Sequence, residues 1–264
     1  MVCGDIQKLS MEEKGGIRFC LKLKLVLKSN KIHFLTIIMD IKMESKRALA
    51  DAEKKAEELF HTIEDKSLIA AGKSEKQLNE EIFELAYEIF GIEKFWHKRI
   101  VRAGENTLHP YDENPPDRII QADDILFFDF GPVFDEWEAD FGRTYVLGND
   151  PVKIKLKEDV ERLWFEVRDW THQQKDLSCS QLYMHCFKRA RQLGWEFGGE
   201  IAGHIVGQFP HERIGKNMIE LYIHPENNDL LSLPDKNGNQ RDWILEIHLV
   251  DRVRKIGGFF EQLL

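Results

Sequence analysis

With 264 residues, 42% of them hydrophobic and 31% charged, the chain has the size and composition of one globular domain at the upper end for a single core. A formal net charge of −9 argues against non-specific nucleic-acid binding, and no apolar run approaches the roughly 18 residues that a membrane helix needs. The four cysteines show no CxxC pair and no disulfide spacing, which indicates reduced thiols in a cytoplasmic protein and argues against a zinc–thiolate site.

The first 42 residues differ in pattern from the remainder of the chain. Residues 20–28 alternate apolar and basic side chains, which is a strand pattern, but the sequence offers no obvious partner strand. We therefore expect Met39 or Met43 to be the functional start, with residues 1–42 a disordered extension or a gene-model artefact and residues 43–264 the folded domain. The alternative is that the extension is a weak targeting arm.

Apolar residues at helical spacing predict four helices. They are expected over residues 44–64, 74–90, 151–171 and 180–194. The second begins with the capping-box sequence Ser74 to Gln77, and the fourth ends at Gly194, which favours helix termination. Runs of β-branched and aromatic residues predict strands over residues 99–102, 125–130, 143–147, 219–223 and 243–250.

Two aspartates, Asp129 and Asp140, lie eleven positions apart on what the pattern predicts to be adjacent strands. The strand that contains Asp129 is almost wholly apolar, and a carboxylate buried there is costly unless a positive charge compensates it. A turn over residues 131–138 would bring the two carboxylates together, where they would repel each other. A divalent cation between them would remove both problems. The alternatives are a buried aspartate paired with Arg143, or a hairpin whose acidic residues face water.

Further candidate ligands follow in the second half of the chain. His204 and His211 lie seven positions apart among glycines and small residues, Glu246 lies in an apolar strand, and Glu261 lies in an apolar, glycine-rich stretch. Together with the two aspartates they supply four carboxylates and one imidazole. Such an oxygen-rich set with an imidazole suits Mn, Fe, Co or Zn, and four carboxylates provide enough bridging charge for two ions.

The order Asp, Asp, His, Glu, Glu over residues 44–264 resembles that of the M24 metallopeptidases, namely the methionine aminopeptidases, Xaa-Pro aminopeptidases and prolidases. The resemblance implies an α+β pita-bread fold, with an antiparallel sheet as core and flanking helices, and a catalytic domain over residues 43–264. It also implies two divalent metal ions. Asp129 would chelate one of them and His204 and Glu246 the other, while Asp140 and Glu261 would bridge the two.

The chemistry implied by the resemblance is hydrolysis of an N-terminal peptide bond of a peptide substrate by a hydroxide that bridges the two metals. Glu246 would carry the proton to the leaving amine, and His211 would contact the substrate carbonyl and stabilise its oxyanion. His109, in the segment Leu-His-Pro-Tyr, matches the upstream histidine that lines the substrate pocket. Homodimers are common in this family, so a homodimer is also expected.

Within the family, the segment around His109 favours Xaa-Pro aminopeptidase-like specificity. The chain is too short for the N-terminal domain of the full-length proline-directed enzymes, and its size is closer to that of a methionine aminopeptidase. Only fifteen positions separate Glu246 from Glu261, and Gln262 replaces the usual acidic neighbour. The alternatives are therefore an aminopeptidase of other specificity, including methionine, and a non-catalytic peptide-binding or protein-binding module. A metal-free amidinohydrolase would not need all five ligands.

Four other residues near these motifs have expected roles outside metal ligation. His97 is expected at the surface or in a pocket wall with a structural role, and Trp137 is expected to pack in the turn between the aspartates. His248 lies two positions after Glu246, so it faces the same side of the strand. Arg143, three positions after Asp140, is expected to neutralise nearby carboxylates.

Overall fold

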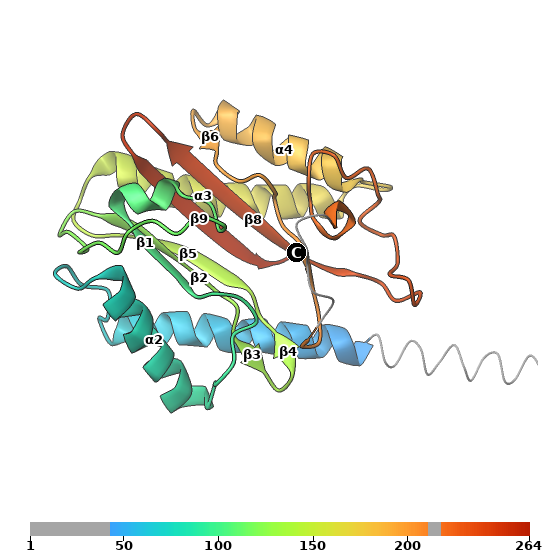
Figure 1. Cartoon of the computed structure of the whole chain (residues 1–264). Coiled ribbons are helices and arrows are strands. Elements are labelled where there is room, and N and C mark those ends of the chain that lie inside the picture. Colours follow the sequence, from blue (N-terminus) through green and yellow to red (C-terminus); the bar gives the residue numbers. More distant parts are fainter. Residues whose placement is uncertain (1–42, 211–217) are drawn as a thin grey trace, which may run out of the picture. The chain divides into compact units, whose positions relative to one another are not determined.

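The computed structural model describes residues 43–210 and 218–264, and its helices follow the apolar spacing of the sequence (Figure 1). The first helix covers residues 43–65. The others are α2 (Glu75–Phe90), α3 (Pro151–His172) and α4 (Cys179–Gln192), with two short 3-10 helices, η1 (Gly104–Leu108) and η2 (Ile219–Leu221). The four predicted helices are confirmed, with ends that differ by at most two residues.

The strands form one large antiparallel sheet and a small hairpin. The large sheet has the order β1-β2-β5-β9-β8-β6, and β7 pairs with β8. Its strands are β1 (Ile100–Ala103), β2 (Ile125–Phe130), β5 (Phe141–Val146), β6 (Glu196–Phe197), β7 (Ile205–Val206), β8 (Asp242–Asp251) and β9 (Ile256–Leu263). The hairpin of β3 (Val133–Phe134) and β4 (Trp137–Glu138) lies in the connection from β2 to β5. The predicted α+β class, with an antiparallel sheet and flanking helices, is confirmed.

The predicted strand over residues 219–223 is wrong. Residues Ile219–Leu221 form η2, in which the amides of Leu221 and Tyr222 donate to carbonyls three residues earlier. The alternating apolar residues are nevertheless buried, since Leu221 and Ile223 lie in the core. A tight turn therefore places these side chains inside without forming a strand. Conversely, β9 was not predicted as a strand, although it pairs with β8 along its whole length.

The helix ends show which capping predictions hold. The Ser74 hydroxyl accepts from the Gln77 amide, but the Gln77 side chain donates to Glu81, so only half of the predicted capping box forms. A complete capping box instead begins α4, between Ser178 and Gln181. In both places the cap satisfies backbone N–H groups that have no partner within the helix.

All four helices cover the same face of the sheet. In β2, Phe128 and Phe130 contact Phe60 of the first helix edge to face. In β8, Leu245 and Ile247 belong to the core cluster that α3 and α4 cover. Figure 1 shows α3 and α4 beside β8 and β9, and α2 beside β1 and β2. Because side chains alternate along a strand, the residues next to these apolar positions face the opposite side of the sheet.

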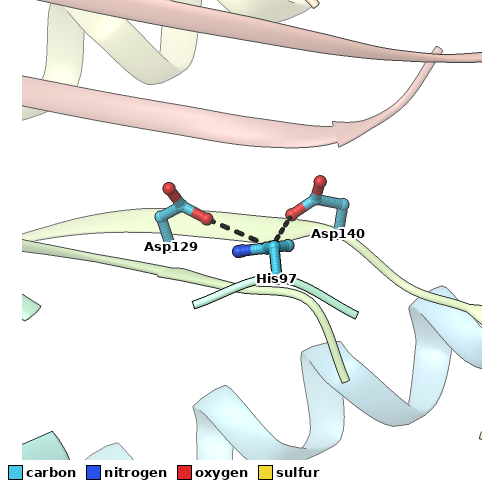
Figure 2. Close-up of side chains that lie close together, drawn as sticks. All are labelled: His97, Asp129 and Asp140. Carbon is cyan, nitrogen blue, oxygen red and sulfur yellow. Dashed lines mark hydrogen bonds and ion pairs between the residues drawn. The ribbon is translucent and has the colours of Figure 1, made fainter. Parts of the chain in front are cut away.

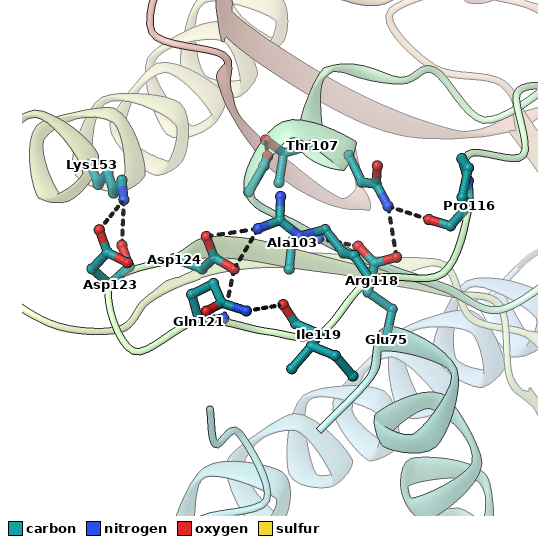
Figure 3. A network of polar contacts seen from close by, with 12 residues as sticks. Glu75, Ala103, Thr107, Pro116, Arg118, Ile119, Gln121, Asp123, Asp124 and Lys153 are labelled. Atoms are coloured by element: carbon teal, nitrogen blue, oxygen red, sulfur yellow. Dashed lines mark hydrogen bonds and ion pairs between the residues drawn. The ribbon is translucent and has the colours of Figure 1, made fainter. Parts of the chain in front are cut away.

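A polar network fixes the segment between β1 and β2 (Figure 3). The buried carboxylate of Glu75, at the start of α2, accepts from the Ala103 amide at 2.6 Å and from the Asn106 side chain at 2.8 Å. Burial raises the pKa of Glu75. Arg118 forms an ion pair with Asp124 at 3.2 Å, just before β2. These contacts anchor both ends of the segment over residues 104–118.

Residues 49–264 form one compact unit. The predicted N-terminal extension over residues 1–42 lies outside the described residues, so its boundary at residue 43 stays a prediction. Among the helices of the described ranges, none combines the length and hydropathy required to cross a membrane.

We predict that Gly203→Ala destabilises the fold far more than Gly238→Ala. Both glycines have positive φ, 139° and 82°, but a Cβ at Gly203 would lie 2.0 Å from the backbone oxygen of Ile244, whereas a Cβ at Gly238 meets nothing within 4 Å. The clash would push residues 202–204 away from β8. Chemical denaturation should show a loss above about 2 kcal/mol for Gly203→Ala and about 1 kcal/mol for Gly238→Ala. Equal losses would contradict this steric explanation.

Candidate metal centre

Three carboxylates lie in one row across the face of the sheet that the helices leave uncovered. Asp129 on β2 is the register partner of Gly142 on β5, Gly142 is the partner of Glu261 on β9, and Glu261 is the partner of Glu246 on β8. Directly paired residues project on the same face of a sheet. Gly142 leaves space inside the row, because a Cβ there would lie 3.0 Å from the Glu261 Cβ.

Asp140 precedes β5 and connects two histidines. Its Oδ1 lies 3.1 Å from Nε2 of His97, and its Oδ2 lies 3.1 Å from Nε2 of His204. His97 Nε2 also lies 3.5 Å from Oδ1 of Asp129, so its ring stands between the two aspartates (Figure 2). His204 Nε2 lies 3.8 Å from Oε1 of Glu261. The two oxygens of Asp140 thus belong to two different groups of donor atoms.

Each group contains one imidazole and two carboxylates whose donor atoms lie within 4.8 Å of one another. The first group is His97, Asp129 and Asp140, and the second is Asp140, His204 and Glu261. Glu246 lies beside the second group, since it is the register partner of Glu261. The Glu261 Oε2 atom is buried and has no hydrogen-bond partner within the described part of the chain.

The carboxylates differ in how strongly they hold a proton. Burial raises the pKa of Asp129 to about 6 and that of Glu246 to about 7. Burial and the charges of Asp140 and Asp129 raise the pKa of Glu261 well above its usual range. Burial would also raise the pKa of Asp140, but His97 and His204 outweigh it and lower the pKa. Without a cation, these neighbouring carboxylates cannot all be ionised at neutral pH.

The carboxylate of Asp140 raises the pKa of both histidines. Burial alone would lower the pKa of His97, but the charges of Asp140 and Asp129 outweigh it and raise the pKa to about 9. For His204, the hydrogen bond to Asp140 likewise outweighs burial and raises the pKa. In the absence of a metal, protons on these rings therefore supply part of the positive charge that the carboxylates require.

These residues fit a divalent metal centre. A buried carboxylate oxygen without a donor, Glu261 Oε2, is the kind of atom that a cation satisfies. The donor set of carboxylate oxygens and imidazole nitrogens suits Mn, Fe, Co or Zn. The fold thus brings together all five predicted ligands, Asp129, Asp140, His204, Glu246 and Glu261, while their individual roles stay predictions.

The other two predicted site residues are not part of these groups. The His109 ring contacts Glu113 in the segment before β2, and the two side chains are 37% and 55% exposed. From the same segment, the Tyr111 ring lies 5.7 Å from the His97 ring, so Tyr111 is the nearer side chain to the donor groups. His211 lies outside the described residues.

Of the two positions expected for His97, the surface position is wrong, whereas a position in the wall of the site and a structural role stay predictions. Its side chain is only 7% exposed and lies within one of the donor groups. Backbone pairing brings the segment of His97 next to the Asp129 strand. The Trp96 amide donates to the carbonyl of Gly131, two residues after Asp129, at 2.9 Å. A histidine shortly before a strand that pairs with the Asp129 strand is the signal that could have revealed it.

Arg143 does interact with nearby carboxylates, Glu53 among them, as expected. The alternative that it pairs with a buried aspartate is wrong, because it lies on the face of the sheet opposite Asp129. Arg143 lies on the helix-covered face. Its guanidinium carbon lies 3.6 Å from the centroid of the Phe141 ring and 3.7 Å from that of the Phe260 ring. It donates to the Glu261 carbonyl at 2.9 Å and to the Gln262 side chain. Arg143 therefore holds the strand that carries Glu261, and the acidic groups nearest to it include Glu53.

Two further expectations agree with the structure. His248 faces the same side of β8 as Glu246, and its Nε2 lies 2.8 Å from the Thr107 carbonyl, while burial lowers its pKa to about 4. Trp137 packs against the apolar core as expected. At the end of β9, the Leu263 amide donates to Glu53 at 2.6 Å, which secures the strand near Glu261.

Comparison with known proteins identifies the family. Residues 47–233 match the model of metallopeptidase family M24, and the chain therefore belongs to this family of hydrolases. The sequence has no match among curated proteins. Among solved structures, the fold is similar to that of a prolidase from Thermococcus sibiricus, with a TM-score of 0.64 and 22% identity over 83% of this chain and 55% of that one.

Two other solved structures share the fold. An X-Pro aminopeptidase from Thermotoga maritima has a TM-score of 0.64 and 19% identity over 83% of this chain and 57% of that chain. A methionine aminopeptidase from Thermotoga maritima has a TM-score of 0.62 and 13% identity over 83% of this chain and 92% of that chain. The chain thus spans little more than half the length of the proline-directed enzymes.

We predict that the metal-free protein loses stability as the pH rises. Relative to ordinary values of 3.8, 4.5 and 6.5, the pKa values of Asp129, Glu246 and His97 rise to about 6, 7 and 9 in the folded protein. Between these values the folded state binds more protons than the unfolded chain, so stability falls with increasing pH. The melting temperature of EDTA-treated protein should fall by roughly 5–10 °C between pH 5 and pH 8.

Added Mn²⁺ should reverse this trend, because the ion replaces the protons and binds best where they are lost. Two lowered pKa values act in the opposite direction. That of Asp140 does so only below its ordinary value of 3.8, and that of His248 only between about 4 and its ordinary value of 6.5, where Asp129 and Glu246 outweigh it. A melting temperature of metal-free protein that stays constant or rises from pH 5 to pH 8 would contradict the prediction.

Proposed function

We propose that this chain is a dinuclear metal-dependent aminopeptidase or dipeptidase that cleaves an N-terminal peptide bond, with Xaa-Pro substrates as its most favoured class. One observation carries the proposal, namely that Asp140 presents its two oxygens to two separate groups of donor atoms. A carboxylate in this position can bridge two cations, and paired cations are a recurrent feature of aminopeptidase sites. Membership of the M24 family supports a hydrolase.

The proposed ligands divide between two ions. Asp129 would bind the first ion and His204 and Glu246 the second, with Asp140 and Glu261 bridging them. When bound, the ions would polarise the scissile carbonyl and lower the pKa of a water molecule. The remaining steps belong to the protein's own side chains.

Glu246 is the proposed proton carrier to the leaving amine. Without metal, burial raises the pKa of Glu246 to about 7, an effect that His204 partly offsets. A carboxyl group placed beside the leaving amine can transfer a proton to it. His211 would donate a hydrogen bond to the carbonyl oxygen as negative charge develops there. His109 and the segment around it would orient the substrate, and Tyr111 is the aromatic side chain of that segment nearest to the donor groups.

A second candidate is an aminopeptidase of other specificity, including the methionine type. The chain covers 92% of the methionine aminopeptidase from Thermotoga maritima but only 55–57% of the first two proline-directed enzymes. The fold is thus shared with both kinds of enzyme, and the sequence around His109 favours Xaa-Pro substrates. A substrate panel of Xaa-Pro dipeptides, Xaa-Pro-Yaa tripeptides and Met-Ala-Ser, supplied with Mn²⁺ or Co²⁺, distinguishes them.

We predict that Asp140→Asn abolishes both metal retention and peptide cleavage. Replacing one oxygen of the proposed bridge by an amide nitrogen removes a ligand from one ion, so turnover should fall about a thousand-fold or more. Asp135→Asn is the matched control, since the Asp135 side chain is 84% exposed in the same connection between β2 and β5. Metal content is measured by elemental analysis and turnover by release of the N-terminal residue.

Full turnover by Asp140→Asn would contradict the proposed mechanism. Wild-type protein that retains about two metals but cleaves no member of the panel would contradict the peptidase assignment and favour the non-catalytic binding module. In that case, binding of the same peptides should be measurable by calorimetry without product formation.

We predict that His211→Ala lowers kcat by about 100-fold while leaving the metal content unchanged. The expected role of His211 is to contact the substrate and not a metal, so elemental analysis of the variant should match the wild type. Loss of metal from His211→Ala would contradict that role, and so would an unchanged kcat.

A further inference from the structure

The feature that the proposed ligand set leaves unexplained is the buried ring of His97. It comes from the segment before β1, far in sequence from the other donors, yet its Nε2 lies 3.1 Å from Asp140 and 3.5 Å from Asp129. Figure 2 shows the ring reaching both carboxylates from one side. A histidine with only a packing role would not need to present a nitrogen to both aspartates.

We propose that His97 Nε2 is a sixth protein ligand, bound to the ion that Asp129 and Asp140 hold. The inference rests on the metal centre of the proposed function. It means that each half of the centre contains one imidazole, His97 in one half and His204 in the other.

The two histidines are held in the same way. Nδ1 of His97 lies 2.8 Å from the carbonyl oxygen of Lys98, and Nδ1 of His204 lies 2.9 Å from that of Ile205, in each case the next residue in the chain. A carbonyl oxygen only accepts, so Nδ1 carries the proton and donates. In a neutral ring Nε2 is then the lone-pair nitrogen, which is the arrangement that orients histidine ligands of metals.

A single aromatic side chain supports both rings. The Trp96 ring meets the His97 ring at a centroid distance of 4.5 Å and the His204 ring at 5.3 Å, both edge to face. Its indole nitrogen donates to the Ala139 carbonyl at 3.0 Å, next to Asp140. Contacts of this one side chain therefore fix the orientation of the two imidazoles relative to Asp140.

The distances around His97 fit donors that share an ion. Bonds of about 2.1 Å place two donors about 3.0 Å apart at an octahedral angle and about 3.4 Å apart at a tetrahedral angle. The observed separations of 3.1 and 3.5 Å from His97 Nε2 to the two aspartate oxygens match these values. They agree as well as those around His204, whose Nε2 lies 3.1 Å from Asp140 and 3.8 Å from Glu261.

A nitrogen ligand in both halves also bears on metal choice. Carboxylate-only sites suit Mg and Mn, whereas imidazole suits Zn and Fe, so His97 should shift the Asp129 half away from Mn. Removing the ring should therefore weaken Co²⁺ binding at one half more than Mn²⁺ binding.

The test uses the metal-free full chain titrated with Co²⁺, followed by calorimetry, visible absorption and proton NMR. The variants are His97→Ala and His97→Gln, with His204→Ala as the positive comparison and His61→Ala, an exposed position on the first helix, as the matched control. Wild type and His61→Ala should bind two Co²⁺ ions and show two exchangeable, paramagnetically shifted imidazole N–H resonances. Both His97 variants should show one resonance, and one of the two ions should bind about 10–100-fold more weakly.

Melting curves of the metal-free variants check that both His97 variants remain folded. Wild type that binds two Co²⁺ ions but shows a single shifted N–H resonance would overturn the His97 assignment and leave the centre intact. Unchanged affinity and spectra in folded His97 variants would also overturn it. Wild type that binds no Co²⁺ would instead overturn the metal centre of the proposed function.

Discussion

The crowding of four carboxylates on one face of the sheet, three of them buried and Glu246 partly buried, is the constraint on which the rest of the structure depends. Three of them, Asp129, Glu261 and Glu246, are aligned by strand register, and Asp140 lies among them. Like charges at such separations cannot coexist in a buried site unless protons or cations neutralise them. The four α-helices pack on the opposite face, so the burial of apolar side chains there offsets the free-energy cost of the acidic face.

The strand that carries Glu261 illustrates how the helix-covered face supports the acidic one. Arg143 lies between Phe141 and Phe260 and donates to the Glu261 carbonyl, so a guanidinium on one face fixes the backbone of a carboxylate that projects from the other. Gly142, the neighbour of Arg143, leaves the space that the Phe259 ring and the Glu261 Cβ occupy. Because side chains alternate along β5, Arg143 stabilises β9 from the helix-covered face, while Gly142 leaves room on the acidic face.

The helices, the Asp129 strand and the order of the donor residues could be predicted from the sequence, because they depend on local periodicity and on motif spacing. Prediction from the sequence failed where the position of a residue depends on pairing between distant segments. The apolar residues of 219–223 are buried as predicted, yet in a 3-10 turn, since period-two spacing alone does not distinguish a strand from a tight turn that buries the same side chains. The partners of His97 and Arg143 could not be predicted, because strand pairing decides which face each side chain occupies and which residues it meets.

Sheet geometry also bears on how many ions the centre suits. Neighbouring strands lie about 4.8 Å apart, so the row from β2 through β5 and β9 to β8 spans about 14 Å at the level of the backbone. Asp129 and Glu246 stand at its two ends, and Asp140 approaches the middle with one oxygen toward each imidazole. One ion with bonds of about 2.1 Å cannot reach donors at both ends of such a row. Two ions a few ångströms apart can, with Asp140 between them, so strand spacing and electrostatics independently favour a dinuclear centre.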